Sequence, residues 1–482
     1  MRAVVWFRGK DLRLREHAAL ARASRGCREL IPVFVLAPEY FEGTAAAGSA
    51  PHRVQFLLES LAELAAGLTA LGSRLLVLRG PALRALPELV AQARADRVFA
   101  IGACEPGARL RDRQLAARLS VPFELCGYET LREPGTLRTG SGGPFQVYTP
   151  FARAALAGFE RPQLTAAIEH LPPWPAQLAL QGEVIPTLAE LGLRHNPNLQ
   201  LGGERAALDR LERFLHDHAA RYHELRDRMD LPGTSRLSAD LHFGTLSART
   251  IYASAHAALA DRQPRAWERF RAELLWREFA HHTLFDRPDV LTKPFRRDFE
   301  GFPWRRDERG WSAWATGHTG YPIVDAAARQ LLREGFVHNR ARMVAASFLT
   351  KHLAIHYRRG EAHYLQWLTD GDPASNNLGW QWCAGSGVDA QPYFRVFNPI
   401  SQGERFDPEG AYVRRYVPEL ARLPTRYIHA PFDAPPAVLE RAGVSLGTTY
   451  PEPVVEHAAA RQRFLLIASE HVGRKRGSSP RM

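Results

Sequence analysis

The sequence predicts an α/β N-terminal domain with a parallel, Rossmann-like sheet, followed by an all-α domain. Three observations support this prediction. Short apolar runs alternate with amphipathic stretches over roughly the first 130 residues, helical spacing of apolar residues dominates from residue 204 onward, and a chain of 482 residues is long enough for two or three domains. Alternation of strand and helix over this length indicates a parallel sheet that helices cover on both faces.

The α/β domain is expected at residues 1–130. Its apolar runs, each short enough for a buried strand, lie at residues 3–7, 31–36, 74–78, 97–101 and 121–126. No Gly-x-Gly-x-x-Gly pattern follows the first run, so the usual dinucleotide fingerprint is absent.

A long connector is expected at residues 131–203, where prolines and glycines interrupt every periodic pattern. It also carries aromatic residues, Phe145, Tyr148 and Phe151, which indicate that it packs against a domain. The helical domain is expected at residues 204–465, and the short basic tail at 466–482 is predicted to be disordered.

The composition favours a polyanionic partner. Lys and Arg together number 63 against 51 acidic residues, which gives a formal charge of +12, and only a few of the 63 are Lys. The planar guanidinium suits phosphate, although a GC-rich genome would also enrich Arg.

Four scattered cysteines, Cys27, Cys104, Cys126 and Cys383, show neither zinc-ligand nor disulfide spacing, and no metal site is predicted. No apolar run is long enough to span a membrane, so the sequence predicts a soluble, cytoplasmic protein. A monomer is expected as well.

The segment 370–399 combines polar and aromatic residues in a way that core packing does not require. Asp370, Asp372 and Asn376 cannot be buried without dedicated partners. Trp380 and Trp382 are two residues apart and cannot share one packing face. The segment therefore predicts a ligand site, with a polar turn between core helices as the alternative.

The same segment carries a family resemblance. Its motifs DGD at 370–372, NN at 376–377, GWQW at 379–382 and YFRVFNP at 393–399 resemble the flavin-binding region of the photolyase and cryptochrome family. Further motifs follow the family order, namely TSRLSADLHFG, ELLWREF, TGYPIVDAAARQL and HNRARM. The resemblance extends from Val4 to about Pro431 and is strongest to bacterial cyclobutane pyrimidine dimer photolyases of the class I type.

The resemblance implies FAD as cofactor. Hydroxyls and consecutive backbone N–H groups at residues 234–238 suit a pyrophosphate, although the same residues could form a helix N-cap cluster. Asn376 matches the residue beside flavin N5, where an amide tolerates the reduced anionic state. The FAD-binding residues that the family implies are Tyr222, Thr234, Ser235, Arg236, Leu237, Ser238, Glu273, Arg277, Asn339, Arg342, Asp370, Asp372 and Asn376.

The resemblance also implies that a pyrimidine dimer, flipped out of UV-damaged DNA, contacts two helices. Glu273, Trp276 and Arg277 fall at i, i+3 and i+4, which places acid, aromatic ring and cation on one face. Asn339 and Met343 share another face, and Glu273, Asn376, Met343 and Trp276 are the implied catalytic residues. The alternatives are a surface Glu273–Arg277 ion pair and a core methionine.

The family's DNA-contacting residues match Arg226, Arg277, Asn339, Arg340, Trp382 and Arg395. The implied activity is a carbon–carbon lyase reaction, light-driven repair of cyclobutane pyrimidine dimers by electron transfer from excited, reduced FAD. The alternatives are a cryptochrome-like photoreceptor, a (6-4) photolyase and a light-independent nucleotide-binding module. Trp276 and Met343 favour repair, because they serve a base substrate.

The antenna and the electron relay depart from the family pattern. Gly107 and Ala108 replace an Asn-Glu pair of folate-binding members, so a deazaflavin or FMN is favoured over folate as a second chromophore. Trp380 and Trp314 match the inner and outer relay members, whereas Tyr357 stands at the middle position. Tyr is harder to oxidise than Trp, and a route through Tyr364 or Trp367 is the alternative.

Overall fold

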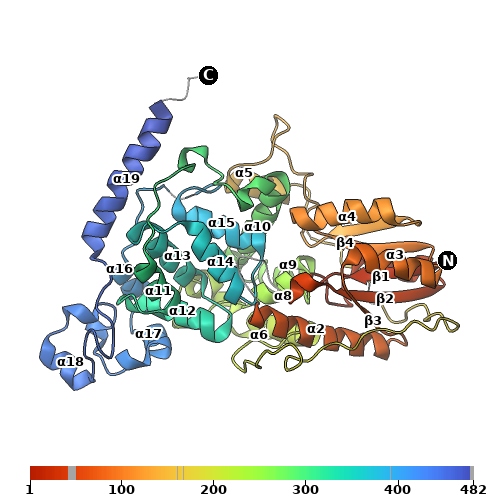
Figure 1. Cartoon of the computed structure of the whole chain (residues 1–482), viewed down its shortest axis with the longest axis horizontal. Coiled ribbons are helices and arrows are strands. Elements are labelled where there is room, and N and C mark those ends of the chain that lie inside the picture. Colours follow the sequence, from red (N-terminus) through yellow and green to blue (C-terminus); the bar gives the residue numbers. More distant parts are fainter. Residues whose placement is uncertain (42–49, 160, 167, 391, 478–482) are drawn as a thin grey trace. The chain divides into compact units, whose positions relative to one another are not determined.

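The computed structural model describes residues 1–41, 50–159, 161–166, 168–390 and 392–477, and its N-terminal part contains a five-stranded parallel sheet (Figure 1). The strand order is β3-β2-β1-β4-β5. The strands are β1 (Arg2–Phe7), β2 (Glu29–Leu36), β3 (Leu76–Arg79), β4 (Arg97–Gly102) and β5 (Phe123–Tyr128). Each predicted apolar run overlaps one of these strands.

Alternate residues of β1 enter two different cores. Val5 and Phe7 pack with apolar residues of α1 (Ala18–Gly26) and α2 (Pro51–Ala70). Val4 and Trp6 pack with those of α3 (Ala82–Ala93) and α4 (Pro106–Arg118). The sheet is therefore buried on both faces, as the near-continuous apolar runs require.

The rest of the chain is helical, and the predicted fold class is confirmed. The remaining α-helices are α5 (Tyr148–Leu156), α6 (Glu204–Asp217), α7 (Tyr222–Leu225), α8 (Ser238–Phe243), α9 (Ala248–Leu259), α10 (Pro264–Asp286), α11 (Glu308–Thr316), α12 (Pro322–Glu334), α13 (Asn339–Ser347), α14 (Tyr357–Trp367), α15 (Pro373–Ala384), α16 (Pro399–Phe406), α17 (Ala411–Tyr416), α18 (Pro436–Ala442) and α19 (His457–Gly477).

The chain divides into two compact units that interleave along the sequence. The first comprises Met1–Ala220, Ser235–Pro288 and Thr369–Ala374, and the second comprises Arg221–Thr234, Asp289–Leu368 and Ser375–Met482. Among the described residues, no helix is long and apolar enough to cross a membrane.

The C-terminal segment is more ordered than predicted. A disordered tail was expected from residue 466, but helix α19 continues to Gly477. Phe464, Ala468 and Val472 follow each other at intervals of four and pack against Phe299 and Phe302. This apolar stripe anchors the helix, and the basic residues beyond it masked the helical pattern in the sequence.

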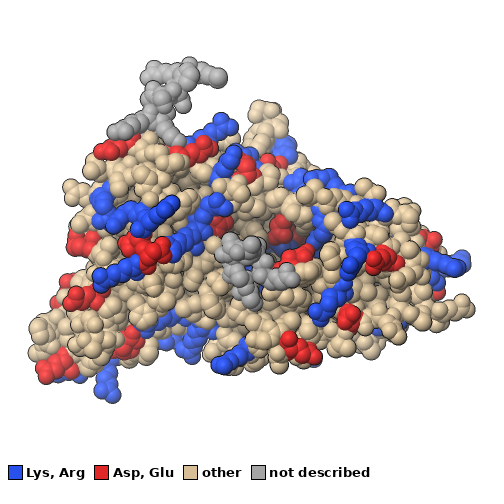
Figure 2. Space-filling view, in the orientation of Figure 1, with Lys and Arg blue, Asp and Glu red and all other residues tan. Residues whose placement is uncertain are grey.

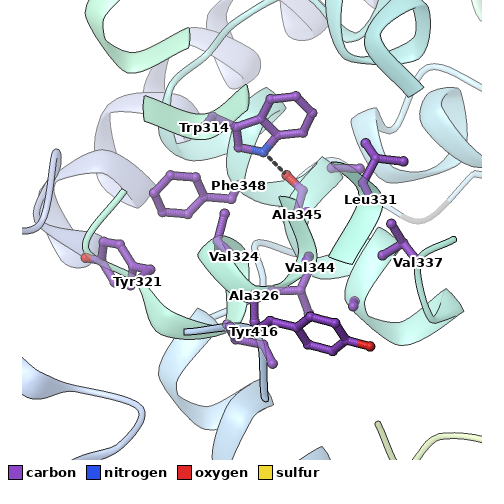
Figure 3. Packing of buried hydrophobic residues seen from close by; sticks show 14 of the residues in the cluster. Trp314, Tyr321, Val324, Ala326, Leu331, Val337, Val344, Ala345, Phe348 and Tyr416 are labelled. Carbon is purple, nitrogen blue, oxygen red and sulfur yellow. Dashed lines mark hydrogen bonds between the residues drawn. The ribbon is translucent and has the colours of Figure 1, made fainter. Parts of the chain in front are cut away.

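The core of the second unit packs around α12, α13 and α14. Trp314 lies among Phe348, Val324 and Leu331, and its Nε1–H donates to Ala345 O at 3.0 Å (Figure 3). A buried indole needs such an acceptor, and the bond fixes the ring in one orientation.

Asp325 organises the start of α12 from within this core. Its fully buried carboxylate accepts hydrogen bonds from Thr319 N at 2.6 Å, Thr319 Oγ1 at 2.7 Å, Gly320 N at 3.2 Å and Tyr450 Oη at 2.7 Å. One side chain thus ties the loop before α12 to Tyr450, far along the chain.

Replacing Asp325 with Ala is expected to destabilise the protein by roughly 3–5 kcal/mol, because several buried donors would lose their acceptor at once. Urea unfolding, compared with Ala at the exposed Asp433, measures the difference. A loss below about 1 kcal/mol would contradict the role given to this network.

Candidate functional site

The DGD segment is held by charged residues of its own unit. Lys10, which follows β1, places Nζ 3.2 Å from Asp372 Oδ2 and 2.5 Å from Glu105 Oε1. His281 Nε2 lies 3.3 Å from the same Asp372 oxygen, and Arg53 Nη1 donates to Gly371 O at 3.1 Å. Both the backbone and the carboxylate of the segment are therefore fixed.

The buried pair is ionised. Burial alone would raise the pKa of Asp372, but the charge of Lys10 outweighs it and holds that pKa well below its usual range. Burial likewise opposes the charge on Lys10, whereas Glu105, Glu129 and Asp372 together raise its pKa. Asp372 is thus an anionic hydrogen-bond acceptor at neutral pH.

The predicted pyrophosphate loop, residues 234–238, runs into the start of α8. Arg236 has a φ of +53°, a strained conformation for a residue other than glycine, and its carbonyl accepts from Gln200 Nε2 at 3.1 Å. Leu237 occupies the N-cap position, without a side-chain capping bond. The alternative of an N-cap cluster is therefore wrong for this helix.

Tyr222 and Arg226 share one side of the short helix α7. Tyr222 is buried, and Arg226 N donates to Tyr222 O at 3.0 Å. The Arg226 guanidinium lies 5.8 Å from the centre of the Tyr222 ring. The predicted i, i+4 relation is thus present, although α7 is only four residues long.

Helix α10 carries Glu273, Trp276 and Arg277. The Arg277 guanidinium donates to Glu129 O at 3.0 Å, and its side chain is only 13% exposed. A DNA phosphate would have to compete with this carbonyl. Trp276 is partly exposed, and Tyr148 stacks against it with ring centres 3.8 Å apart.

Helix α13 presents two faces, as predicted. Asn339 Nδ2 lies 3.8 Å from Met343 Sδ, and Met343 is partly buried and packs against the apolar core of its unit, so its contact with the lesion stays a prediction. Arg340 points elsewhere, with Nη2 2.8 Å from Asp227 Oδ1 and its guanidinium over Phe406 at 4.3 Å.

Arg342, on the same helix, donates from Nε to Val337 O at 2.8 Å. Its predicted contact with FAD stays a prediction.

In α15 the adjacent amides have different partners. Asn376 Nδ2 donates to Glu361 O at 3.0 Å, which turns its amide oxygen away from that carbonyl. Asn377 Nδ2 donates to Glu361 Oε1 at 2.9 Å and to Val290 O at 3.1 Å. Asn377 Oδ1 accepts from Gln381 Nε2 at 3.1 Å. Asn377 and Gln381 thus belong to a structural network, whereas Asn376 keeps an acceptor available.

The burial of the tryptophans differs from that expected for the predicted electron relay. Trp314, predicted as the outer member, is only 2% exposed and lies 5.8 Å from Trp380 between ring centres. Trp311 stacks on Trp314 at 5.4 Å and is partly exposed, so the surface end of this chain is Trp311. Both Trp311 and Trp314 belong to α11, whose depth in the fold the sequence did not reveal.

Tyr357 contacts a different tryptophan, Trp304, at 6.5 Å between ring centres. Its Oη is buried and has no hydrogen-bond partner within the described part of the chain, and burial raises its pKa. The His356 ring lies 4.8 Å away, but its Nδ1 accepts from Arg358 N. Within the described residues, no hydrogen bond therefore joins the Tyr357 hydroxyl to a base.

The chain is similar to known protein families and to individual known proteins. The family model of DNA photolyase matches residues 3–175, and that of the FAD binding domain of DNA photolyase matches residues 270–470. A deoxyribodipyrimidine photo-lyase from Agrobacterium fabrum is 41% identical over 470 residues, which cover 96% of each chain. The chain belongs to the photolyase and cryptochrome family.

Two solved structures of the photolyase and cryptochrome family resemble the whole chain. A bacterial class III photolyase from Agrobacterium tumefaciens has a TM-score of 0.89 at 40% identity and covers 98% of each chain. A cryptochrome from Synechocystis has a TM-score of 0.88 at 30% identity, covering 96% of this chain and 98% of its own. The class I type predicted from the sequence stays a prediction, since the similar photolyase structure from Agrobacterium tumefaciens is class III.

The residues present fit FAD, the cofactor of the matched family domain. The strained loop at 234–238 offers hydroxyls and backbone N–H groups, the donors that a pyrophosphate requires. The oriented amide oxygen of Asn376 is an acceptor for a ring N–H, and Asp372 is a fixed anion that accepts from hydroxyls. These groups supply both the donors and the acceptors that this photolyase-family cofactor needs.

The position of the missing Asn-Glu pair is the first turn of α4. Gly107 and Ala108 lie there, and the next residue, Arg109, donates to Phe285 O at 2.7 Å with its guanidinium 3.6 Å from the Phe285 ring centre. An arginine contact thus lies beside the position where folate-binding photolyases carry two polar side chains.

Basic side chains are interspersed with acidic ones over the face drawn in Figure 2, with no continuous basic stripe on that face. Arg395 is exposed, with its guanidinium 5.8 Å from the Phe397 ring centre, and its contact with DNA stays a prediction.

Sequence reasoning missed Lys10, Arg53, His281 and Trp311. A signal existed for Lys10, which follows the first strand, at the carboxyl edge where α/β proteins build their sites. No signal existed for Arg53 and His281, which lie inside helices and reach the DGD segment only through the fold.

Glu361 gives the second unit a pH-dependent stability. Burial raises the pKa of Glu361 to about 7, although the Asn377 hydrogen bond opposes this. Because the folded pKa lies above the ordinary value, the stabilising contribution is fully present below the ordinary pKa and is lost as the pH rises through about 7. Between about pH 5 and 8 the contribution of Glu361 alone should fall by on the order of 2 kcal/mol.

Glu361→Gln should remove most of this slope, since an amide oxygen still accepts from Asn377 and does not ionise. Denaturant unfolding at several pH values measures it, with Glu→Gln at the exposed Glu404 as control. An identical slope in Glu361→Gln would show that this carboxyl does not titrate there.

Proposed function

We propose that this chain is a DNA photolyase, a carbon–carbon lyase that repairs cyclobutane pyrimidine dimers in DNA under blue light. The observation that best supports this proposal is the 41% identity, over 96% of each chain, with a protein named deoxyribodipyrimidine photo-lyase. The chemistry of Trp276, Met343 and Asn376 supports it, since each side chain offers a group that the reaction needs.

The residues proposed to bind the lesion supply stacking and hydrogen bonding. Trp276 offers a partly exposed indole, and Glu273 offers a carboxyl on the same face of α10. Met343 offers a partly exposed thioether, which can adapt to the face of an aromatic ring. A dimer flipped out of the helix would be read in this way by stacking and at its base edges.

Reduced FAD, when bound, supplies under light the electron that opens the cyclobutane ring and receives it back. The protein's own contribution is to orient the partners and exclude water. Asn376 supports this by presenting a carbonyl oxygen, because its NH2 group is committed to Glu361 O. The fixed charge of Asp372 adds an acceptor that does not move during the reaction.

The cryptochrome alternative finds less support. The Synechocystis cryptochrome is 30% identical to this chain, whereas the photolyase from Agrobacterium tumefaciens is 40% identical. The (6-4) alternative also has no observation in its favour here. A deazaflavin or FMN antenna, a monomeric state and a cytoplasmic location stay predictions.

The test is repair itself. Reduced, FAD-loaded protein mixed with an oligonucleotide carrying one cyclobutane thymine dimer should restore thymine absorbance under blue light and not in the dark. The control is the same mixture with a (6-4) photoproduct. Repair of the (6-4) product alone would overturn the proposed substrate, and FAD binding without any repair would favour the photoreceptor.

For the electron relay we propose the route Trp380, Trp314 and Trp311. Their consecutive ring centres are 5.8 and 5.4 Å apart, and all three are tryptophans, which can lose an electron without first losing a proton. Tyr357 and Tyr364 are less suited, because each has a buried hydroxyl with no acceptor within the described part of the chain. A chain of indoles thus replaces the route through Tyr357 predicted from the sequence.

Trp311→Phe should therefore slow the photoreduction of bound FAD severalfold, whereas Tyr357→Phe should change it little. The bleaching of oxidised flavin under blue light, with an external reductant present, measures the rate. Trp367→Phe, in the neighbouring helix α14, is the matched control. A large loss in Tyr357→Phe with none in Trp311→Phe would restore the route through Tyr357.

A further inference from the structure

One face of Trp276 is already covered by another aromatic ring. Tyr148, the first residue of α5, stacks on Trp276 of α10 with ring centres 3.8 Å apart and an angle of 4° between the planes. Both residues belong to the first unit. The two rings are nearly parallel and in full contact, the arrangement that a stacked base would otherwise adopt.

The phenol is fixed at its far end as well. Tyr148 Oη donates to Ala272 O at 3.0 Å, and Ala272 lies four residues before Trp276 on the same helix. Tyr148 is therefore attached to α10 through its hydroxyl while its ring lies on the indole one turn later.

A second aromatic ring supports the pair from the side. Phe279 meets the Trp276 ring edge-on at 6.0 Å and the Tyr148 ring edge-on at 6.2 Å. Phe151, one turn after Tyr148 in α5, packs on Phe279 at 5.1 Å. The indole therefore rests against a block of three other aromatic side chains.

The stack leaves one face of Trp276 for a ligand. A base inserted between the two rings would need roughly twice the present separation of 3.8 Å, so the covered face is closed. Trp276 nevertheless remains partly exposed. Its exposure therefore lies elsewhere than on the face that Tyr148 covers.

We propose that Tyr148 is a positioning residue for lesion recognition, holding the Trp276 indole in the orientation in which its open face receives the flipped pyrimidine dimer. This inference rests on the proposed function. A free indole samples several rotamers and loses that freedom when a base stacks on it, whereas an indole already held by Tyr148 loses little. The connector between the sheet and the helices thus contributes directly to affinity for damaged DNA.

Binding in the dark to two duplexes tests the proposal, one carrying a single cyclobutane thymine dimer and one undamaged. Tyr148→Leu in the FAD-loaded full-length protein should weaken binding to the damaged duplex by about threefold to tenfold, the equivalent of one stacked aromatic pair. Binding to the undamaged duplex should not change. Tyr148→Phe should keep most of the affinity, because the ring stays in place.

Two comparisons separate positioning from general damage. Phe145→Leu, three residues upstream on the same connector, removes a ring that packs on Phe151 and should leave both affinities unchanged. In a Trp276→Ala background, Tyr148→Leu should have no further effect on the damaged duplex, since the indole it positions is gone. If the Tyr148→Leu variant does not retain FAD, Tyr148→His replaces it in the same comparison with and without Trp276→Ala.

Equal losses from Tyr148→Leu with and without Trp276 would overturn the proposal, and so would equal losses on both duplexes. Tighter binding by Tyr148→Leu would also overturn it, because Tyr148 would then be a plug that the lesion displaces. A parent protein that does not distinguish the two duplexes would contradict the proposed function itself. If the parent protein prefers the damaged duplex and Tyr148→Leu keeps the same preference, only the role of Tyr148 is contradicted.

Discussion

The ion pair between Lys10 and Asp372 is the constraint on which the site depends. A buried carboxylate is tolerated only when a counter-charge and hydrogen bonds compensate its lost hydration, and Lys10 supplies the charge. Asp372 immediately precedes α15, so the pair fixes the point at which this helix begins. A lysine that follows the first strand thus holds a carboxylate 362 positions later in the chain.

Much of the fold could be predicted because strand patterns and helix patterns occupy separate stretches of the sequence. The strands of the sheet are buried on both faces and read as plain apolar runs, while the long helices repeat apolar residues every three to four positions. Helix faces could also be predicted, as Asn339 and Met343 show by lying together while Arg340 turns to Asp227. These relations follow from helix geometry alone and need no knowledge of the surroundings.

How deeply a side chain is buried, and which residues it bonds to, could not be predicted in the same way. Trp314 and Trp311 have similar local sequences, yet one is buried against Trp380 and the other reaches the surface. Asn376 and Asn377 are adjacent and chemically identical, yet Asn377 bridges Glu361, Val290 and Gln381, while Asn376 bonds a single carbonyl. Which residue becomes structural depends on segments distant in the sequence, and a single sequence carries no record of that packing.

Arg359 gives the outer end of the tryptophan chain an electrostatic bias. Its guanidinium lies 4.2 Å from the centre of the Trp311 ring and bonds Glu308 at 2.7 Å on its other side. An indole that has lost an electron is a cation, and the neighbouring guanidinium raises its energy. Release of the indole proton to solvent removes that repulsion, and the neutral radical cannot regain the electron without also regaining a proton. In the proposed relay, charge recombination would thereby be slowed at the surface, so that each absorbed photon would leave a longer-lived separated state.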